Sequence, residues 1–236
     1  MAVAIVSLMA GALAPLAVSQ LRSGRVRAAH AQMKRIVYAM VGAPGSSAAG
    51  YVGDMGSLPQ SLQALNDGTG LPAYAFNATD GVGYGWAGPY LPELTAPGAP
   101  LVDPWNRSYR YRRSRAQVTS AGPDRRFGTA DDLPYPPSPL PASGNVTVTV
   151  LGVPRAGGPS QQLDSSRAAV FLASSAGGRR REQLLSGVGP FTATGLHLGP
   201  HAVRAQGRLN YSGAVARDVV VVGFGTALVT LTLDEP

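Results

Sequence analysis

The chain contains no cysteine among its 236 residues. This excludes disulfide bonds, cysteine-based zinc sites and thiol nucleophiles, and it leaves the redox compartment open. Lysine occurs once, at Lys34, so the net charge of +7 comes almost entirely from arginine. No charged residue occurs from Met1 to Val18, and no acidic residue precedes Asp54.

Common catalytic motifs are also missing. The sequence has no G-x-S-x-G, no P-loop and no HExxH. His197 and His201 have the H-x-x-x-H spacing, but a Leu-Gly-Pro turn between two expected strands separates them, so they do not share a helix face. We therefore expect no enzymatic activity, no catalytic residues and no cofactor-binding residues.

The basic character raises the question of nucleic acid, because the isoelectric point is about 10.1. Tyrosine and arginine alternate from Ser108 to Arg115, as they do in some nucleic-acid binders. The same alternation is typical of a strand with one face solvated by arginine. We favour the strand and expect no nucleic-acid partner.

The N-terminal residues 1–43 are predicted to form one long helix. The uncharged stretch is about the minimum that spans a bilayer, roughly 17–25 residues. An apolar stripe at helical spacing then runs through Val26, Ala29, Met33, Ile36, Val37 and Met40. Gly42, Pro44 and Gly45 are expected to end the helix.

Three interpretations of this helix compete. A cleaved signal peptide needs a basic region before the apolar stretch, and this chain has none. An ordinary anchor would place the arginine-rich side, and the rest of the chain, in the cytoplasm. The third interpretation is a helix that packs into a filament.

The apolar stretch from Ala4 to Pro15 resembles the N-terminus of type IV pilins and pseudopilins. The family has an Ala-Ile pair, mixed aliphatic residues and then a proline. Aligned on that proline, Met1 falls after the family's mature N-terminus, so a leader peptide and the family's glutamate would lie upstream. The resemblance implies that the following residues lie in the membrane or the filament core: Ala4, Ile5, Leu8, Ala10, Gly11, Leu13 and Pro15.

The middle segment is similar to the major pseudopilin of type II secretion. Its order is a Gly-Asp helix motif at 53–54, the turn Gly88-Pro89-Tyr90-Leu91 and the strand motif that begins Asp103-Pro104-Trp105-Asn106. Before the turn, Ser57 or Pro59 is expected to open a short helix with Leu58, Leu62 and Leu65 on one face. Trp105 is expected in the core, and Asn106 replaces the family's glycine because asparagine tolerates positive φ.

A glycine-containing loop carries three carboxylates, Asp124, Asp131 and Asp132. Calcium takes oxygens from carboxylates, carbonyls and water. The loop resembles the calcium loop of major pseudopilins, whose acidic ligands share the spacing of Asp124 and Asp131. The resemblance implies a calcium site with Asp132 and the Ala121 carbonyl as added ligands. The alternative is a pair of Asp-rich turns neutralised by neighbouring arginines, each exposed pair being worth at most about 1 kcal/mol.

Residues 134–143 form a proline-rich linker, and composition changes after it. Short alternating segments from Asn145 to Leu233, separated by turn residues, predict an all-β sandwich at 144–236. The run Gly189–Ala205 looks like a signature of transthyretin-like or carboxypeptidase-regulatory-like domains. Such domains are structural or binding modules, and the ligand of this one stays unknown.

The predicted fold class is therefore α+β. It has a long N-terminal pilin helix at 1–43, a small β-sheet head with the calcium loop at 44–133, the linker and the sandwich. The expected function is a structural subunit of a type II secretion or type IV pilus filament, assembled with other pilin-like subunits. Its expected location is the inner membrane, single-pass, with a periplasmic or extracellular head. The alternative is a membrane-tethered binding protein or adhesin that uses the sandwich.

Overall fold

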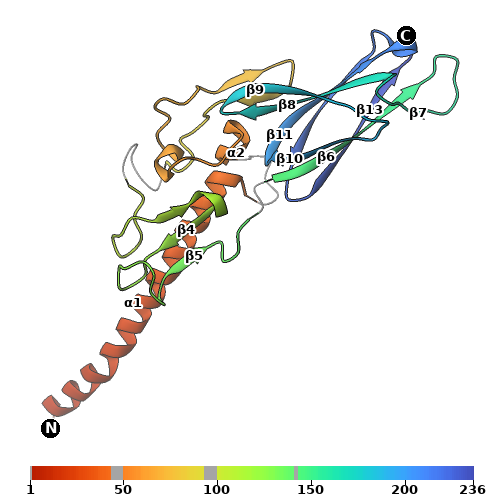
Figure 1. The fold of residues 1–236 in the computed structure, drawn as a ribbon. Helices are drawn as coiled ribbons and strands as arrows, with labels where there is room; N and C mark the ends of the chain where they lie inside the picture. The colour runs from red at the N-terminus through yellow and green to blue at the C-terminus, as the bar shows by residue number, and fades with distance from the viewer. Residues whose placement is uncertain (1, 44–49, 93–99, 141–142) are drawn as a thin grey trace.

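The computed structural model describes residues 2–43, 50–92, 100–140 and 143–236, with side chains from Ser19 onward. One long N-terminal helix, α1 (Ala2–Val41), carries a small head, and a two-sheet sandwich lies at the opposite end of the molecule (Figure 1). The predicted α+β class with an all-β C-terminal part is confirmed.

The C-terminal half of α1 is held by its apolar stripe. Ala29, Met33, Ile36 and Val37 are fully buried, as their spacing along one helix face predicts. The helix ends where Gly42 adopts φ 84° and donates its N–H to the Tyr38 carbonyl at 2.8 Å. A glycine in this left-handed conformation is the commonest helix stop. Pro44 and Gly45, also expected to end the helix, lie outside the described residues.

The head is built from short elements around that stripe. They are α2 (Gly50–Met55), the 3-10 helices η1 (Leu62–Leu65) and η2 (Arg113–Arg115), the hairpin β1 (Ala75–Asn77) and β2 (Val82–Tyr84), and the antiparallel sheet of β3 (Arg110–Arg112), β4 (Gln117–Ser120) and β5 (Leu133–Tyr135). Val118 of β4 and Leu65 of η1 are fully buried with the α1 stripe. Trp105 joins this core, and Asn106 has φ 60°, both as predicted.

The predicted short helix opening at Ser57 or Pro59 is wrong in its extent. Only one 3-10 turn forms, with Leu62 and Leu65 buried, and Ser61 precedes it in an extended conformation. The helix that does pack on α1 is α2, which contains the Gly53-Asp54 motif that the resemblance places on a helix. Its Tyr51, Val52 and Met55 are buried although two glycines weaken its helical propensity, so tertiary packing decides its conformation.

The sandwich contains two sheets. One is β10 (Phe191–His197), β6 (Ser143–Val153) and β13 (Thr226–Asp234), with β7 (Gln161–Gln162) paired to β6. The other has the order β12 (Val215–Val222), β11 (Gly199–Gly207), β8 (Ala168–Ala176) and β9 (Arg179–Leu185). β13 runs parallel to β6, and the other pairs are antiparallel.

Alternation along the strands builds the sandwich core. Val146, Val148 and Val150 of β6 are fully buried while the residues between them are half-exposed. Val170 and Leu172 of β8 and Phe191 belong to the same core. These period-two patterns are what the sequence predicts for half-buried strands.

The linker expected at 134–143 begins inside the head, because Pro134 and Tyr135 belong to β5, which pairs with β4. The sandwich strand β6 starts at Ser143.

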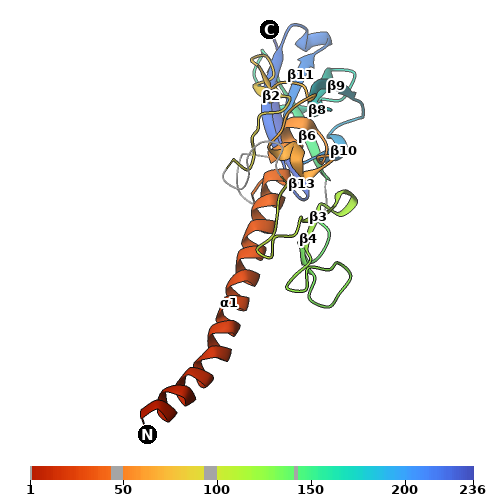
Figure 2. The same ribbon diagram turned by 90° about the vertical axis from the view of Figure 1, so that its left-hand side faces the viewer.

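Figures 1 and 2 show α1 pointing away from the head at one end, with α2 next to the sandwich at the other. The expected division into domains stays a prediction, because the two parts also share an interface.

Candidate functional site

The stretch of α1 before Ala29 extends beyond the head. In residues 19–28 only Gly24 and Val26 are half-buried, and the others are exposed. Leu21 is 70% exposed. Figure 2 shows this part of α1 projecting from the molecule. An apolar side chain on such a helix is open to contact with another subunit.

Within the described residues, no helix is sufficiently long and apolar to cross a membrane. The side chains expected in the membrane or filament core lie outside the described ones, although the backbone there belongs to α1: Ala4, Ile5, Leu8, Ala10, Gly11, Leu13 and Pro15.

The acidic loop, residues 121–132, connects β4 to β5. Its three predicted carboxylates accept backbone N–H groups of the same loop. Asp131 Oδ2 accepts from Asp124 N at 3.0 Å. Asp124 Oδ1 accepts from Arg126 N at 2.7 Å, and Asp132 Oδ2 accepts from Gly128 N at 2.8 Å. The loop is thus a compact set of turns that its own carboxylates hold together.

Gly122 permits this closure. It has φ 66°, and a Cβ built on it would lie 2.3 Å from the Asp131 carbonyl oxygen. Any other residue would push the two ends of the loop apart. The hydrogen bonds from the Asp124 backbone and from Thr129 lower the pKa of Asp131, so this carboxylate stays ionised in mildly acidic solution.

The acidic loop is tied to the strand motif at its base. Buried Ser120 donates to Asp103 Oδ2 at 2.6 Å, and Gly122 N donates to Ser120 Oγ at 3.2 Å. Asp103 Oδ1 accepts from Trp105 N at 3.0 Å and Arg107 N at 2.9 Å. The Asp-Pro-Trp-Asn motif therefore has a physical role: its buried carboxylate fixes the turn that supports the loop.

The loop offers an oxygen that could serve a cation. Asp132 Oδ1 is buried and has no hydrogen-bond partner among the described residues. No group of three or more His, Cys, Asp or Glu side chains near enough to hold a metal occurs in the described part of the chain. Calcium also accepts carbonyl and water oxygens, so a site with two carboxylates is compatible with that finding.

The arginines of the loop do not neutralise it. Across the described ranges, neither Arg125 nor Arg126 forms an ion pair with a loop carboxylate. Arg125 donates to the Asn106 carbonyl at 3.4 Å instead. Phe127 lies under Arg110, whose guanidinium carbon is 3.9 Å from the ring centroid. The loop carboxylates are therefore not paired with the arginines of their own loop.

The head–sandwich interface joins α2, β2 and the turn before β2 to β8, β9 and β11. Ser175 Oγ donates to the Asp54 carbonyl at 2.6 Å, and Gly178 N donates to the Met55 carbonyl at 3.0 Å. Arg180 makes a two-bond contact with Asp80, through Nε to Oδ2 at 2.6 Å and Nη2 to Oδ1 at 3.1 Å.

These contacts hold the two parts in a defined orientation. Sequence reasoning missed them, because the partners of the Arg180 contact are 100 positions apart and carry no shared motif.

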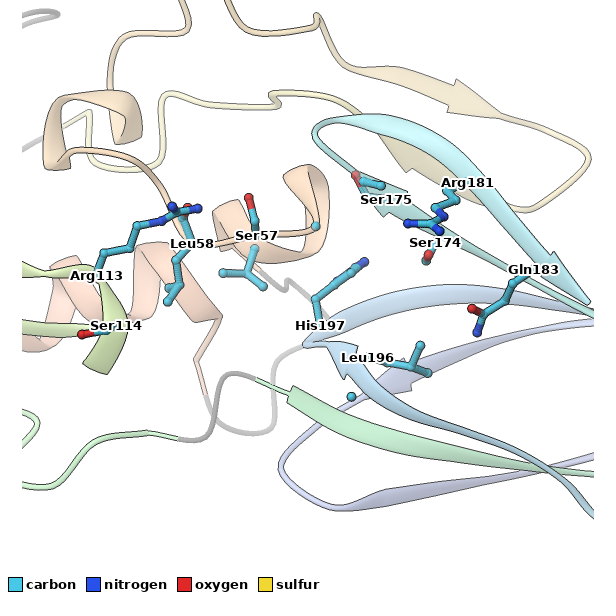
Figure 3. Close-up of a pocket in the computed structure, with 14 residues that line it drawn as sticks. Ser57, Leu58, Arg113, Ser114, Ser174, Ser175, Arg181, Gln183, Leu196 and His197 are labelled. Carbon is cyan, nitrogen blue, oxygen red and sulfur yellow. The ribbon is translucent and has the colours of Figure 1, made fainter. Parts of the chain in front are cut away.

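A cleft of about 800 Å³ opens along this interface (Figure 3). His197 lines it, and its ring lies 4.4 Å, centroid to centroid, from the ring of buried His201. His197 Nδ1 lies 3.0 Å from the Leu198 carbonyl, and His201 Nε2 lies 2.9 Å from the His197 carbonyl. The turn predicted between them thus brings the two rings together.

Because a carbonyl only accepts, those two nitrogens carry the protons. His197 Nε2 and His201 Nδ1 are then acceptors, and both are buried without a partner in the described residues. Burial lowers the pKa of His197, against the effect of the Leu198 and Ser175 backbone. Burial and the neighbouring His197 lower the pKa of His201 to about 4.

Comparison with solved structures finds partial likenesses. A candidate carbohydrate-binding protein of Pseudomonas aeruginosa is 14% identical with a TM-score of 0.29, over 39% of this chain and 88% of that one. A pilus-presented adhesin, Cpa, is 12% identical with a TM-score of 0.26, over 41% of this chain. The chain spans only 28% of the adhesin's length. Likeness at this level says nothing about function.

No curated protein matches the chain. Residues 17–133 match the family model described as type II secretion system (T2SS), protein G. The match contains α1 from Ala17 onward, the head and the acidic loop, and it ends where β5 begins. Residues 17–133 therefore match the family of type II secretion system protein G, the major pseudopilin, over about half of the chain, and a β-sandwich follows that part.

Proposed function

We propose that the chain is a pseudopilin-like structural subunit that assembles, through α1, into a filament with other pilin-like subunits. The observation that carries the proposal is the projecting half of α1 in a chain whose residues 17–133 match type II secretion protein G. That family consists of structural subunits, not of enzymes.

The physical reason for assembly is the division of α1 into two parts. From Ala29 onward its apolar stripe is buried by the head, and from Ser19 to Ala28 its side chains are exposed or half-buried. A helix continued by the uncharged stretch 2–18 gains free energy when neighbouring helices or lipid cover it. Packing of such helices in a bundle would leave the heads and sandwiches outside.

We place the apolar half of α1 in the inner membrane before assembly, with the head and sandwich on the extracytoplasmic side. Support comes from the absence of charge in residues 1–18 and from the family match. The arginines that follow, from Arg22, would then lie on the extracytoplasmic side, against the charge rule for ordinary anchors.

We further propose that the acidic loop binds calcium with carboxylate ligands drawn from Asp124, Asp131 and Asp132, and with the Ala121 carbonyl as a further ligand. The unpartnered Asp132 Oδ1 and the inward turn at Gly122 support this. Bound calcium would neutralise the clustered carboxylates and hold the loop against the strand motif. Its role would be structural.

Photo-cross-linking tests the filament proposal. Because the chain has no cysteine, Leu21→Cys gives a single attachment point for a benzophenone label on the projecting helix. Each subunit of an open helical assembly has neighbours on both sides. Irradiated membranes of expressing cells should therefore give a ladder of covalent dimers, trimers and larger species.

Ser160→Cys provides the matched control. This residue is exposed in the loop that leads into β7, at the end of the sandwich farthest from α1 (Figure 1). A ladder from Leu21→Cys and little from Ser160→Cys supports assembly through α1. Only monomer from Leu21→Cys, or equal ladders from both, would contradict it and favour a tethered binding protein.

A further inference from the structure

The cleft at the head–sandwich interface has walls from both parts of the chain. Figure 3 shows Ser57, Leu58 and Arg113 of the head opposite Ser174, Arg181 and His197 of the sandwich. The space, about 800 Å³, is large enough for several residues of an extended peptide. Neither part would form this cleft alone.

Two open strand edges border the cleft. β9 pairs only with β8, and β10 pairs only with β6, so each ends its sheet among the described residues. Arg181 and Gln183 of β9, and Gly195 to His197 of β10, line the cleft. An edge strand presents unpaired N–H and C=O groups that can pair with another chain.

The charged side chains that line the cleft in the described residues are all positive. Its lining in the described residues contains Arg113 and Arg181 and no aspartate or glutamate. Arg113 is oriented by donating its Nε to the Leu58 carbonyl at 3.1 Å, which leaves its terminal nitrogens available. Arg181 forms no ion pair with any described residue, whereas Arg180 beside it is paired with Asp80 and Glu182.

We propose that this cleft binds an extended acidic segment of a partner protein, which adds as a strand beside β9 and pairs its carboxylates with Arg113 and Arg181. A peptide supplies the backbone groups that pair with the edge of β9 and the carboxylates that pair with the two arginines. Sugar recognition is less well matched, because no tyrosine, tryptophan or phenylalanine among the described residues lines the cleft to pack on a sugar ring.

The arginines on β9 also define specificity. Charged side chains on an edge strand discourage pairing with other strands. They do so least for a strand of opposite charge, so the same residues would reject neutral or basic segments. The proposal is independent of filament assembly.

Fluorescence anisotropy with the full chain in detergent tests the proposal. The probe is a fluorescein-labelled peptide that alternates glutamate with threonine, and a peptide with lysine in place of glutamate is its control. The acidic peptide should bind saturably and the basic one should not. Arg181→Glu should weaken binding about tenfold or more, because it places two like charges next to each other.

Arg179→Glu is the matched control variant. It makes the same charge change on the same strand, but Arg179 does not line the cleft. It should weaken binding far less than Arg181→Glu. If Arg181→Glu does not fold, Arg113→Gln tests the opposite wall, and it should also weaken binding.

Amide hydrogen exchange gives a second measurement, because strand addition should slow exchange along β9. The proposal is overturned by no binding of the acidic peptide, by equal effects of Arg181→Glu and Arg179→Glu, or by unchanged exchange in β9. Displacement of the peptide by an oligomer of uronic acid at equal concentration would also overturn it, in favour of an acidic carbohydrate.

Discussion

Replacing Gly56 by alanine is expected to loosen the head–sandwich interface. Gly56 follows α2 with φ 76°, and a Cβ there would lie 2.1 Å from the Ser175 carbonyl oxygen. Left-handed backbone costs a non-glycine residue about 1–2 kcal/mol. Overpacking against a fixed backbone atom adds about 1–3 kcal/mol. The total loss in the free energy of unfolding is therefore about 2–5 kcal/mol.

Gly70→Ala separates the two contributions. Gly70 has φ 78°, nearly the same conformation, but no described atom lies within 4 Å of the position that a Cβ would take there. It should cost only the backbone contribution, about 1–2 kcal/mol. Urea unfolding of both variants measures the difference, and a thermal melt should show about 2–4 °C per kcal/mol for a chain of this size.

Equal effects of the two substitutions would refute this reasoning. If Gly56→Ala and Gly70→Ala lose the same stability, the head and the sandwich do not pack together as described. Gly56→Ala should in addition weaken the acidic peptide's binding, because Gly56 lies in the wall of the cleft.

Three further predictions concern charged and titratable groups. Millimolar Ca²⁺ should raise the melting temperature of the full chain. Asp124→Ala should abolish this rise, whereas the control Asp234→Ala should retain it. No rise in the unaltered chain would contradict the calcium site. Because the pKa of His201 is lowered to about 4 in the folded state, the unfolded chain binds more protons below pH ~6.5. Stability should therefore fall, by up to about 3 kcal/mol, as the pH drops from about 6.5 towards 4, and His201→Gln should flatten this slope in urea titrations. Asp80→Asn should cost about 1 kcal/mol, since Arg180 is partly exposed, while Asp234→Asn, which is exposed at the end of β13, should be neutral in the same assay.

The sequence predicts the repeating parts of this fold well. The stripe from Ala29 to Met40 is a helical period, and the alternation in β6 is a strand period, so each follows from burial of one face. β9 was not predicted, because Arg179, Arg180 and Arg181 suppress the alternation of apolar and polar residues. An edge strand tolerates such charges, since its outer side faces solvent.

Only the part of the site that lies within one continuous segment could be predicted from the sequence. The acidic loop is one continuous segment, and its carboxylates were found by spacing. The cleft and the interface join residues far apart, such as Ser175 and Asp54 at a separation of 121 positions, and no motif marks them. Contacts of this kind depend on how the surfaces of the head and the sandwich pack together. Neither the composition nor the periodicity of the sequence predicts that packing.

The most direct test of the filament account is electron microscopy of sheared surface and membrane fractions, followed by helical reconstruction. The account predicts filaments whose centre consists of α1 helices packed side by side, with the sandwiches on the outside. A fraction that contains the chain but no filaments, or filaments with the sandwiches at the axis and α1 exposed, would contradict it.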